Sequence, residues 1–117
     1  MRVSLIITTY NRPDALMLVL QSIANQTKLP EEVIIADDGS DDKTKKLITN
    51  YQESSSLNII HSWQEDKGFR LAKSRNKAIA ISNFEYIILI DGDVILHPKF
   101  IQDHKGTWIK NPEWTDN

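Results

Sequence analysis

Two carboxylates, one residue apart, directly follow one of the most apolar runs of the chain. The segment ILIDGDVIL, residues 88–96, places Asp91 and Asp93 on either side of Gly92. The glycine lets the backbone bend so that both side chains can face one site, and two such carboxylates repel unless a cation or a proton lies between them. A few hard oxygen ligands favour Mg²⁺ or Mn²⁺ that keeps waters and shares phosphate oxygens. A solvated Asp-Gly turn accounts for the same residues, so the motif alone leaves both interpretations open.

A second acidic pair, Asp37 and Asp38, follows the apolar run EVIIA. At this place in a nucleotide-binding sheet, an acidic residue often accepts hydrogen bonds from a ribose or a base. Helix capping is the other interpretation, and with Ser40 as the cap it accounts for Asp41 and Asp42. Capping explains Asp37 less well, because that residue follows the predicted strand directly.

Basic and amide side chains interrupt an otherwise apolar helical pattern in GFRLAKSRNKAIA, residues 68–80. On a helix, Ala72, Arg75 or Asn76, and Ile79 lie on one stripe, which predicts that Arg75 and Asn76 fall on the face that packs on a sheet. A buried guanidinium needs an anionic partner.

That partner is either internal, with Asp38 and Asp91 as the candidates, or it is a ligand phosphate. Arg70 lies one turn nearer the predicted helix start and is better placed to reach a diphosphate. Gly68 permits close approach of the backbone to a ligand.

Four short apolar runs, at residues 3–9, 32–36, 57–61 and 85–90, must position these groups. They are rich in Ile and Val and nearly continuous, which predicts parallel strands buried on both faces. Helical patterns at residues 13–26, 41–52 and 69–82 alternate with them. We therefore expect a doubly wound α/β protein, with a mainly parallel sheet between two layers of helices. Ligands bind beyond the carboxyl ends of such strands, so the residues after each strand should meet at one edge.

The totals fit this picture and exclude several classes. A chain of 117 residues with 40% apolar and 26% charged residues is expected to form one soluble domain. A net charge of −2 gives no reason to expect a nucleic-acid partner, and the absence of cysteine excludes disulfides. No signal peptide or membrane span is predicted. A cytoplasmic protein is expected, and one that works peripherally at the inner membrane face has the same features.

Four segments taken together resemble a known family: VSLIITTYNRPDALMLVLQSIANQT, EVIIADDGSDD, EDKGFRLAKSRNKAI and YIILIDGDVILHPKFI. In this order and spacing they resemble the N-terminal, nucleotide-sugar-binding half of family 2 glycosyltransferases, which has the GT-A fold. The resemblance covers about residues 1–105, and residues 106–117 are expected to be an irregular tail or the start of an acceptor-binding half. GFRLAKSRNKAI is similar to bacterial enzymes that extend lipopolysaccharide or capsule glycans, including chondroitin-polymerase-like domains.

The resemblance implies transfer of a sugar from a UDP-sugar to a growing surface glycan or a lipid-linked acceptor, with inversion, assisted by Mn²⁺ or Mg²⁺. Asp91 and Asp93 would form the metal-binding DxD pair, with Asp93 on the metal and Asp91 near the ribose and donor sugar. The expected nucleotide-sugar site consists of Thr8, Tyr10, Asn11, Arg12, Asp37, Asp38, Asp66, Gly68, Arg70, Arg75, Asn76 and Asp91.

The catalytic base stays unassigned, because in this family it belongs to a second half that the resemblance does not cover. One alternative is a non-catalytic or incomplete nucleotide-binding fragment that needs its C-terminal half or a partner chain, including a homo-oligomer formed through an exposed edge. Another is a phosphatase with Asp91 as nucleophile, but that motif should end the first strand of a long domain, and here it ends the fourth predicted strand.

Overall fold

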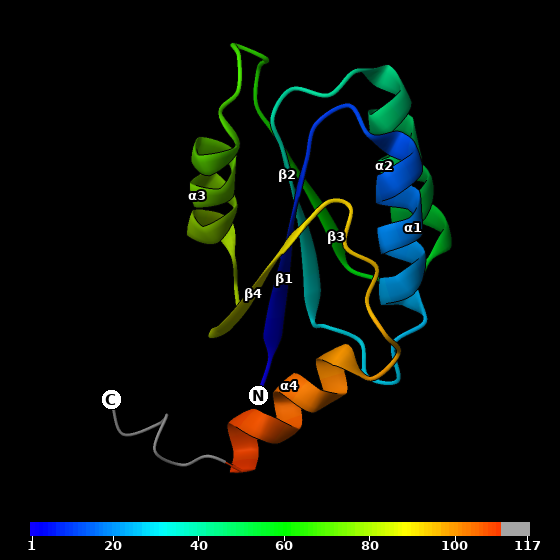
Figure 1. Cartoon of the computed structure of the whole chain (residues 1–117), viewed down its shortest axis with the longest axis vertical. Helices are drawn as coiled ribbons and strands as arrows, with labels where there is room; N and C mark the ends of the chain where they lie inside the picture. The colour runs from blue at the N-terminus through cyan, green and yellow to red at the C-terminus, as the bar shows by residue number, and fades with distance from the viewer. Residues whose placement is uncertain (111–117) are drawn as a thin grey trace.

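The computed structural model describes residues 1–110, with side chains described to residue 105. Strands and helices alternate along this part of the chain (Figure 1). In chain order they are β1 (Val3–Thr9), α1 (Pro13–Ala24), β2 (Glu32–Asp37), α2 (Asp42–Ser54), β3 (Ile59–Trp63), α3 (Leu71–Ile81), β4 (Tyr86–Asp91) and α4 (Phe100–Lys110).

The strands form one parallel sheet in the order β3-β2-β1-β4. Helices α1 and α2 cover one face and α3 the other, so the doubly wound, three-layer prediction is confirmed (Figure 1). Because all four strands run the same way, their carboxyl ends meet at the edge drawn at the top of Figure 1. The loops that leave β1, β2, β3 and β4 therefore lie together at that edge.

Side-chain alternation along β1 divides the core into two layers. Leu5 and Ile7 pack with α1, α2 and α4, whereas Ile6 packs with Ala78 of α3. Each fully buried aliphatic side chain of this size stabilises the fold by about 1.5–3 kcal/mol. The central strands β1 and β2 are buried at every position, as their continuous apolar runs predict.

The same prediction is wrong for β4, which lies at the edge of the sheet. Ile88 is buried on the α1 side, but Ile87 and Leu89 point to the α3 side and are 36% and 48% exposed. Helix α3 packs on β2, β1 and β3 and leaves this face of β4 open. An apolar run thus marks a strand without revealing its place in the sheet.

The prediction of which face of α3 packs on the sheet is also wrong. Ser74 and Ala78 are its buried residues, whereas Ala72 and Asn76 are exposed. The helix begins at Leu71, two residues after its predicted start. With a one-residue error in phase, an apolar stripe moves by about 100° around a helix.

Two further helix boundaries differ from prediction. Asp41, and not Ser40, caps α2 by accepting a hydrogen bond from the backbone N–H of Lys43 at 3.2 Å. Helix α4 was not predicted, and it extends into the segment from residue 106 that was expected to be an irregular tail or the start of an acceptor-binding half. Its residue Ile101 packs into the core. The rest of that tail lies outside the described residues. No helix among residues 1–110 is long and apolar enough to span a membrane.

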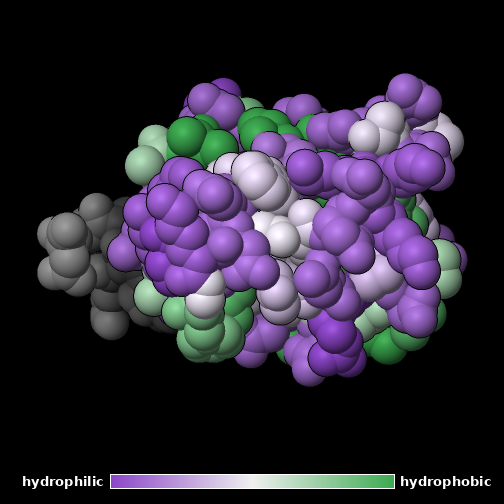
Figure 2. Space-filling view, turned by 90° about the horizontal axis from the view of Figure 1, so that it is seen from above, coloured by the Kyte–Doolittle hydropathy of each residue, from purple (hydrophilic) through white to green (hydrophobic). Residues whose placement is uncertain are grey.

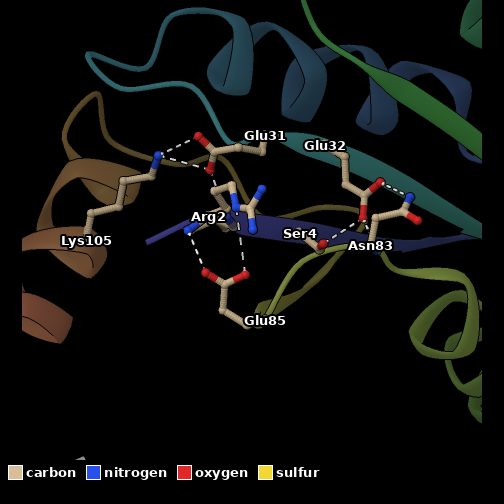
Figure 3. A network of polar contacts seen from close by, with 8 residues as sticks. Arg2, Ser4, Glu31, Glu32, Asn83, Glu85 and Lys105 are labelled. Atoms are coloured by element: carbon tan, nitrogen blue, oxygen red, sulfur yellow. Dashed lines mark hydrogen bonds and ion pairs between the residues drawn. The ribbon is translucent and has the colours of Figure 1, made fainter. Parts of the chain in front are cut away.

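A polar network fixes the opposite, N-terminal end of the sheet (Figure 3). The fully buried Glu32 carboxylate accepts hydrogen bonds from Ser4 Oγ at 2.6 Å, Asn83 N at 2.7 Å and Asn83 Nδ2 at 2.8 Å. Glu31 accepts two bonds from Lys105 Nζ, at 3.0 and 2.9 Å, and so ties α4 to the start of β2. Burial alone would raise the pKa of Glu32, but the three donors outweigh it and hold the pKa below its ordinary value of 4.5.

This lowered pKa predicts acid sensitivity. The carboxylate of Glu32 contributes stability that is complete above its unfolded-state pKa and is lost as the pH falls through the lower, folded-state pKa. We expect the free energy of unfolding, measured by urea denaturation at a series of pH values, to fall below about pH 4.5. Glu32→Gln should lower stability at neutral pH by about 2 kcal/mol and flatten the acid limb. Glu53→Gln, on the exposed side of α2, is the control and should reproduce the wild-type curve.

Candidate functional site

A cleft of about 500 Å³ opens at the carboxyl edge of the sheet, between the N-terminal ends of α1 and α3. Figure 2 looks down on this edge and shows a mainly hydrophilic surface with apolar side chains toward its margins. The lining residues are Thr8, Thr9, Tyr10, Arg12, Ala15, Phe69, Leu71, Asp91, Gly92 and Asp93. The predicted meeting of post-strand segments is thus observed for the segments after β1 and β4 and for the segment before α3.

Asp91 is the last residue of β4 and pairs in register with Thr8 of β1. Thr8 Oγ1 lies 3.4 Å from Asp91 Oδ1, a long hydrogen bond that orients the carboxylate toward the cleft. Gly92 lies against β1 so closely that a Cβ atom there would overlap the Thr8 carbonyl oxygen. The glycine therefore allows the turn that places Asp91 and Asp93 in the same cleft.

The two carboxylates suit a divalent cation held partly by other ligands. Both side chains are exposed to the cleft. No group of three or more His, Cys, Asp or Glu side chains in the described part of the chain could enclose a metal ion. A cation here would have at most these two carboxylates as acidic ligands and would complete its shell with water or phosphate oxygens, as Mg²⁺ commonly does.

Tyr10, which lines the cleft, forms a bridge between two loops. Its hydroxyl donates to Asp66 Oδ2 at 2.8 Å and so connects the loop after β1 with the loop between β3 and α3. This hydrogen bond, and then the negative charge of Asp66, raise the pKa of Tyr10 above its ordinary value of 10.0. Asp66 therefore holds Tyr10 in place, although Asp66 itself is not among the residues that line the cleft.

The bridge makes a prediction for the titration of Tyr10. Asp66→Asn should lower the pKa of Tyr10 toward 10.0, because the carboxylate that disfavours the phenolate is gone. An NMR titration of ring-labelled tyrosine measures this pKa, and Tyr10→Phe identifies the resonance. Asp42→Asn, at the start of α2, should leave the titration unchanged. An unaltered Tyr10 pKa in Asp66→Asn would show that the bridge does not form in solution.

Asn11 organises two loops. Its φ of 47° is left-handed, a conformation that asparagine adopts more readily than most residues. Asn11 N donates to Ser40 Oγ at 2.8 Å, and Asn11 Oδ1 accepts from Asp41 N at 2.7 Å. These bonds tie the loop after β1 to the loop after β2. The structure thus places Asn11 beside the cleft with a positioning role, not in its lining.

Asp37 and Asp38 differ in their surroundings. Asp37 is fully buried, accepts from Ser40 N at 2.9 Å and lies 2.8 Å from His61 Nε2, so its carboxylate is engaged inside the protein. Asp38 accepts from Gln64 Nε2 at 2.7 Å and from Arg70 N at 2.7 Å. Neither lines the cleft, and both hold loops that border it.

Of the two partners considered for Arg75, an internal carboxylate or a ligand phosphate, the internal ion pair is absent from the described residues. Asp38 binds Gln64 and the Arg70 backbone, and Asp91 binds Thr8, so neither pairs with the half-buried Arg75. Helical spacing places Arg75 one turn beyond Leu71, which lines the cleft. Arg75 itself is not among the residues that line the cleft.

Three more of the predicted residues, Gly68, Arg70 and Asn76, do not line the cleft. Arg70 directs its guanidinium to the Glu65 carbonyl at 3.0 Å, and Gly68 donates its N–H to Asp66 Oδ1 at 3.2 Å. Asn76 is exposed on α3. The structure therefore brings Thr8, Tyr10, Arg12, Asp91 and Asp93 into the lining and leaves the other predicted residues around it.

Four lining residues were not predicted from the sequence: Thr9, Ala15, Phe69 and Leu71. Thr9 is 4% exposed, and its hydroxyl oxygen has no hydrogen-bond partner among the described residues. Phe69 was assigned to the helix that in fact starts two residues later. The signal that could have identified Phe69 is an aromatic residue between a glycine and the first turn of a helix.

Comparisons with known proteins agree with this architecture. The chain matches the model of Glycosyl transferase family 2 over residues 4–113. Hyaluronan synthase of Pasteurella multocida is 32% identical over 113 residues, which cover 96% of this chain and 11% of that protein. Validoxylamine A glucosyltransferase of Streptomyces hygroscopicus subsp. limoneus is 36% identical over 101 residues, or 85% of this chain and 22% of that protein. The chain thus spans less than a quarter of either relative.

Solved structures show the same fold. The crystal structure of S. aureus TarS 1–349 in complex with UDP-GlcNAc superposes with a TM-score of 0.85 at 27% identity. The match covers 95% of this chain and 32% of the TarS chain. The parallel sheet, the cleft at its carboxyl edge and the match over residues 4–113 lead to one assignment. The chain belongs to glycosyl transferase family 2 and has the α/β architecture of the N-terminal region of its GT-A enzymes.

Proposed function

We propose that the cleft binds the UDP moiety of a UDP-sugar and that the chain acts in the transfer of that sugar, with inversion, to a growing surface glycan or a lipid-linked acceptor. The observation that carries this proposal is the pair Asp91 and Asp93 in a cleft at the carboxyl edge of a parallel sheet. Nucleotide ligands bind at this edge in open α/β sheets. TarS, which has the same fold, was solved with UDP-GlcNAc.

Asp91 and Asp93 would hold the divalent cation, Mn²⁺ or Mg²⁺, together with diphosphate oxygens. Bound there, the cation would neutralise charge that develops on the leaving diphosphate. Thr8 orients Asp91, and Arg12 adds a positive charge to the same cleft. Arg75, which has no ion-pair partner among the described residues, is proposed to make a further contact with the diphosphate.

Tyr10 and the loops held by Asn11, Asp37, Asp38 and Asp66 would receive the nucleoside. The Tyr10–Asp66 hydrogen bond and the Asp38–Arg70 backbone bond fix the geometry of these loops before a ligand arrives. Prior fixation lowers the entropy lost on binding. Gly68, Arg70 and Asn76 complete the surroundings of the nucleotide in this proposal.

Turnover is proposed to need further polypeptide, supplied either by a C-terminal half or by a partner chain. The observation that favours this view is the open α3-side face of β4, where Ile87 and Leu89 are exposed just below Asp91. An uncovered apolar face on an edge strand is a site of association with another polypeptide, which can be a second copy of this chain. The catalytic base would come from the added polypeptide. The proposed location is the cytoplasm, free or at the inner face of the membrane.

Calorimetric titration of UDP tests the nucleotide claim. Binding is expected in the presence of Mn²⁺, and it should weaken at least tenfold in the presence of a chelator, because the diphosphate then faces two unshielded carboxylates. Equal affinity in both conditions would contradict metal-dependent binding. The absence of binding in both, by protein shown to be folded by circular dichroism, would contradict the nucleotide site itself.

A further inference from the structure

Phe69 is the most exposed large apolar side chain among the described residues and lines the proposed nucleotide cleft. The residue is 87% exposed, and its ring has no ring partner in the described part of the chain. Apolar surface left in water forgoes the favourable free energy of burial. A single exposed residue is common, so its anchoring and its place in the cleft decide whether it has a role.

The backbone on both sides of Phe69 is fixed. Arg70 N, just after it, donates to the buried Asp38 carboxylate at 2.7 Å. Gly68 N, just before it, donates to Asp66 Oδ1 at 3.2 Å, and Asp66 Oδ2 accepts from Tyr10 at 2.8 Å. The exposed ring is therefore presented to the cleft by an anchored loop.

Two chemically different kinds of side chain line the cleft. Asp91 and Asp93 supply the carboxylates at the end of β4, where the proposed function places the metal and the diphosphate. Phe69 and Tyr10 are two exposed aromatic side chains that line the cleft, and the loop that carries Phe69 is tied to Tyr10 through Asp66. In a nucleoside diphosphate, the base lies beyond the ribose, away from the metal-bound phosphates.

We propose that Phe69 is a stacking platform for the nucleobase of the nucleoside diphosphate. This inference rests on the proposed function and adds a residue to it. An aromatic ring stacks on the face of any base and does not read the hydrogen-bonding edge. Phe69 thus strengthens binding of the nucleoside without selecting uracil over other bases.

The test compares a ligand that has a base with one that has none, both with Mn²⁺: UDP and inorganic pyrophosphate. Phe69→Ala should weaken UDP binding by about 5- to 100-fold and leave pyrophosphate binding unchanged. Phe69→Tyr keeps the ring and should bind UDP like the wild type. Leu18→Ala, which truncates an exposed side chain on α1 away from the cleft, should leave both affinities unchanged. The uracil absorbance should fall on binding to the wild type, as stacked bases absorb less, and not on binding to Phe69→Ala.

Three results would overturn the proposal while leaving the proposed function in place: an unchanged UDP affinity in Phe69→Ala, an equal loss for UDP and pyrophosphate, or an equal loss in Phe69→Tyr. The first would mean that no base contacts the ring, and the second that the loop, not the ring, matters. Failure of the wild type to bind UDP at all would remove the proposed function and this inference together.

Discussion

Conversion of Asp91 and Asp93 to asparagine should abolish metal-dependent binding of UDP. We expect the double variant to lose at least about 100-fold in affinity when Mn²⁺ is present, which corresponds to about 2.8 kcal/mol. The reason is that both acidic ligands of the proposed cation line the same cleft and no third acidic or histidine ligand among the described residues could replace them. Calorimetry with UDP and Mn²⁺ measures the loss.

The variant should fold normally, because the replacement removes repulsion between neighbouring carboxylates and breaks only the 3.4 Å contact with Thr8. The double variant Glu53→Gln/Asp103→Asn removes the same two negative charges at exposed positions of α2 and α4, so it is the matched control and should bind UDP like the wild type. If the double variant kept wild-type affinity in Mn²⁺, these carboxylates would not be the metal ligands.

Replacement of Gly92 by alanine should damage both stability and the site. The added Cβ would overlap the carbonyl oxygen of Thr8, and that carbonyl belongs to the central strand β1, which is paired on both sides. The turn that carries Asp93 must therefore move. We expect a loss of about 1–3 kcal/mol in the free energy of unfolding and at least a tenfold loss of UDP affinity in Mn²⁺.

Gly68→Ala provides the comparison for this variant. Gly68 has a left-handed φ of 87°, but an added Cβ there would meet no atom within 4 Å. It should cost about 1–2 kcal/mol through backbone strain alone and should leave Asp91 and Asp93 in place. Urea denaturation of both variants separates the overlap with β1 from backbone strain alone. A Gly92→Ala protein with wild-type stability and affinity would show that the turn does not lie against β1 as described.

The alternation of strands and helices was predictable because it depends on local periodicity. The four apolar runs and three helical patterns each correspond to an observed element, and parallel pairing brings the ends of β1 and β4 together. The burial of β4 was not predictable in the same way. The sequence of β4 is as apolar as that of a central strand. Only the sheet order shows that α3 does not cover Ile87 and Leu89.

The lining of the cleft was predictable where residues lie at or just after the carboxyl end of a strand, as with Thr8, Tyr10, Asp91 and Asp93. It was not predictable where long-range hydrogen bonds decide which way a side chain points. Asp37 points inward to His61, and Asp38 bonds to Gln64 and to the Arg70 backbone. These two carboxylates were expected to contact the ligand, but they hold loops in place instead. Phe69 was missed because the boundary of α3 could not be placed to within two residues.

The most direct test of the central claim is the position of the metal. In crystals grown with UDP and Mn²⁺, the anomalous signal of manganese should give a peak between the carboxylates of Asp91 and Asp93 and the diphosphate, at about 2.0–2.3 Å from its oxygen ligands. The nucleoside should extend from there toward Tyr10. A manganese peak elsewhere, or UDP bound outside the cleft, would contradict the assignment of this edge of the sheet as the donor site.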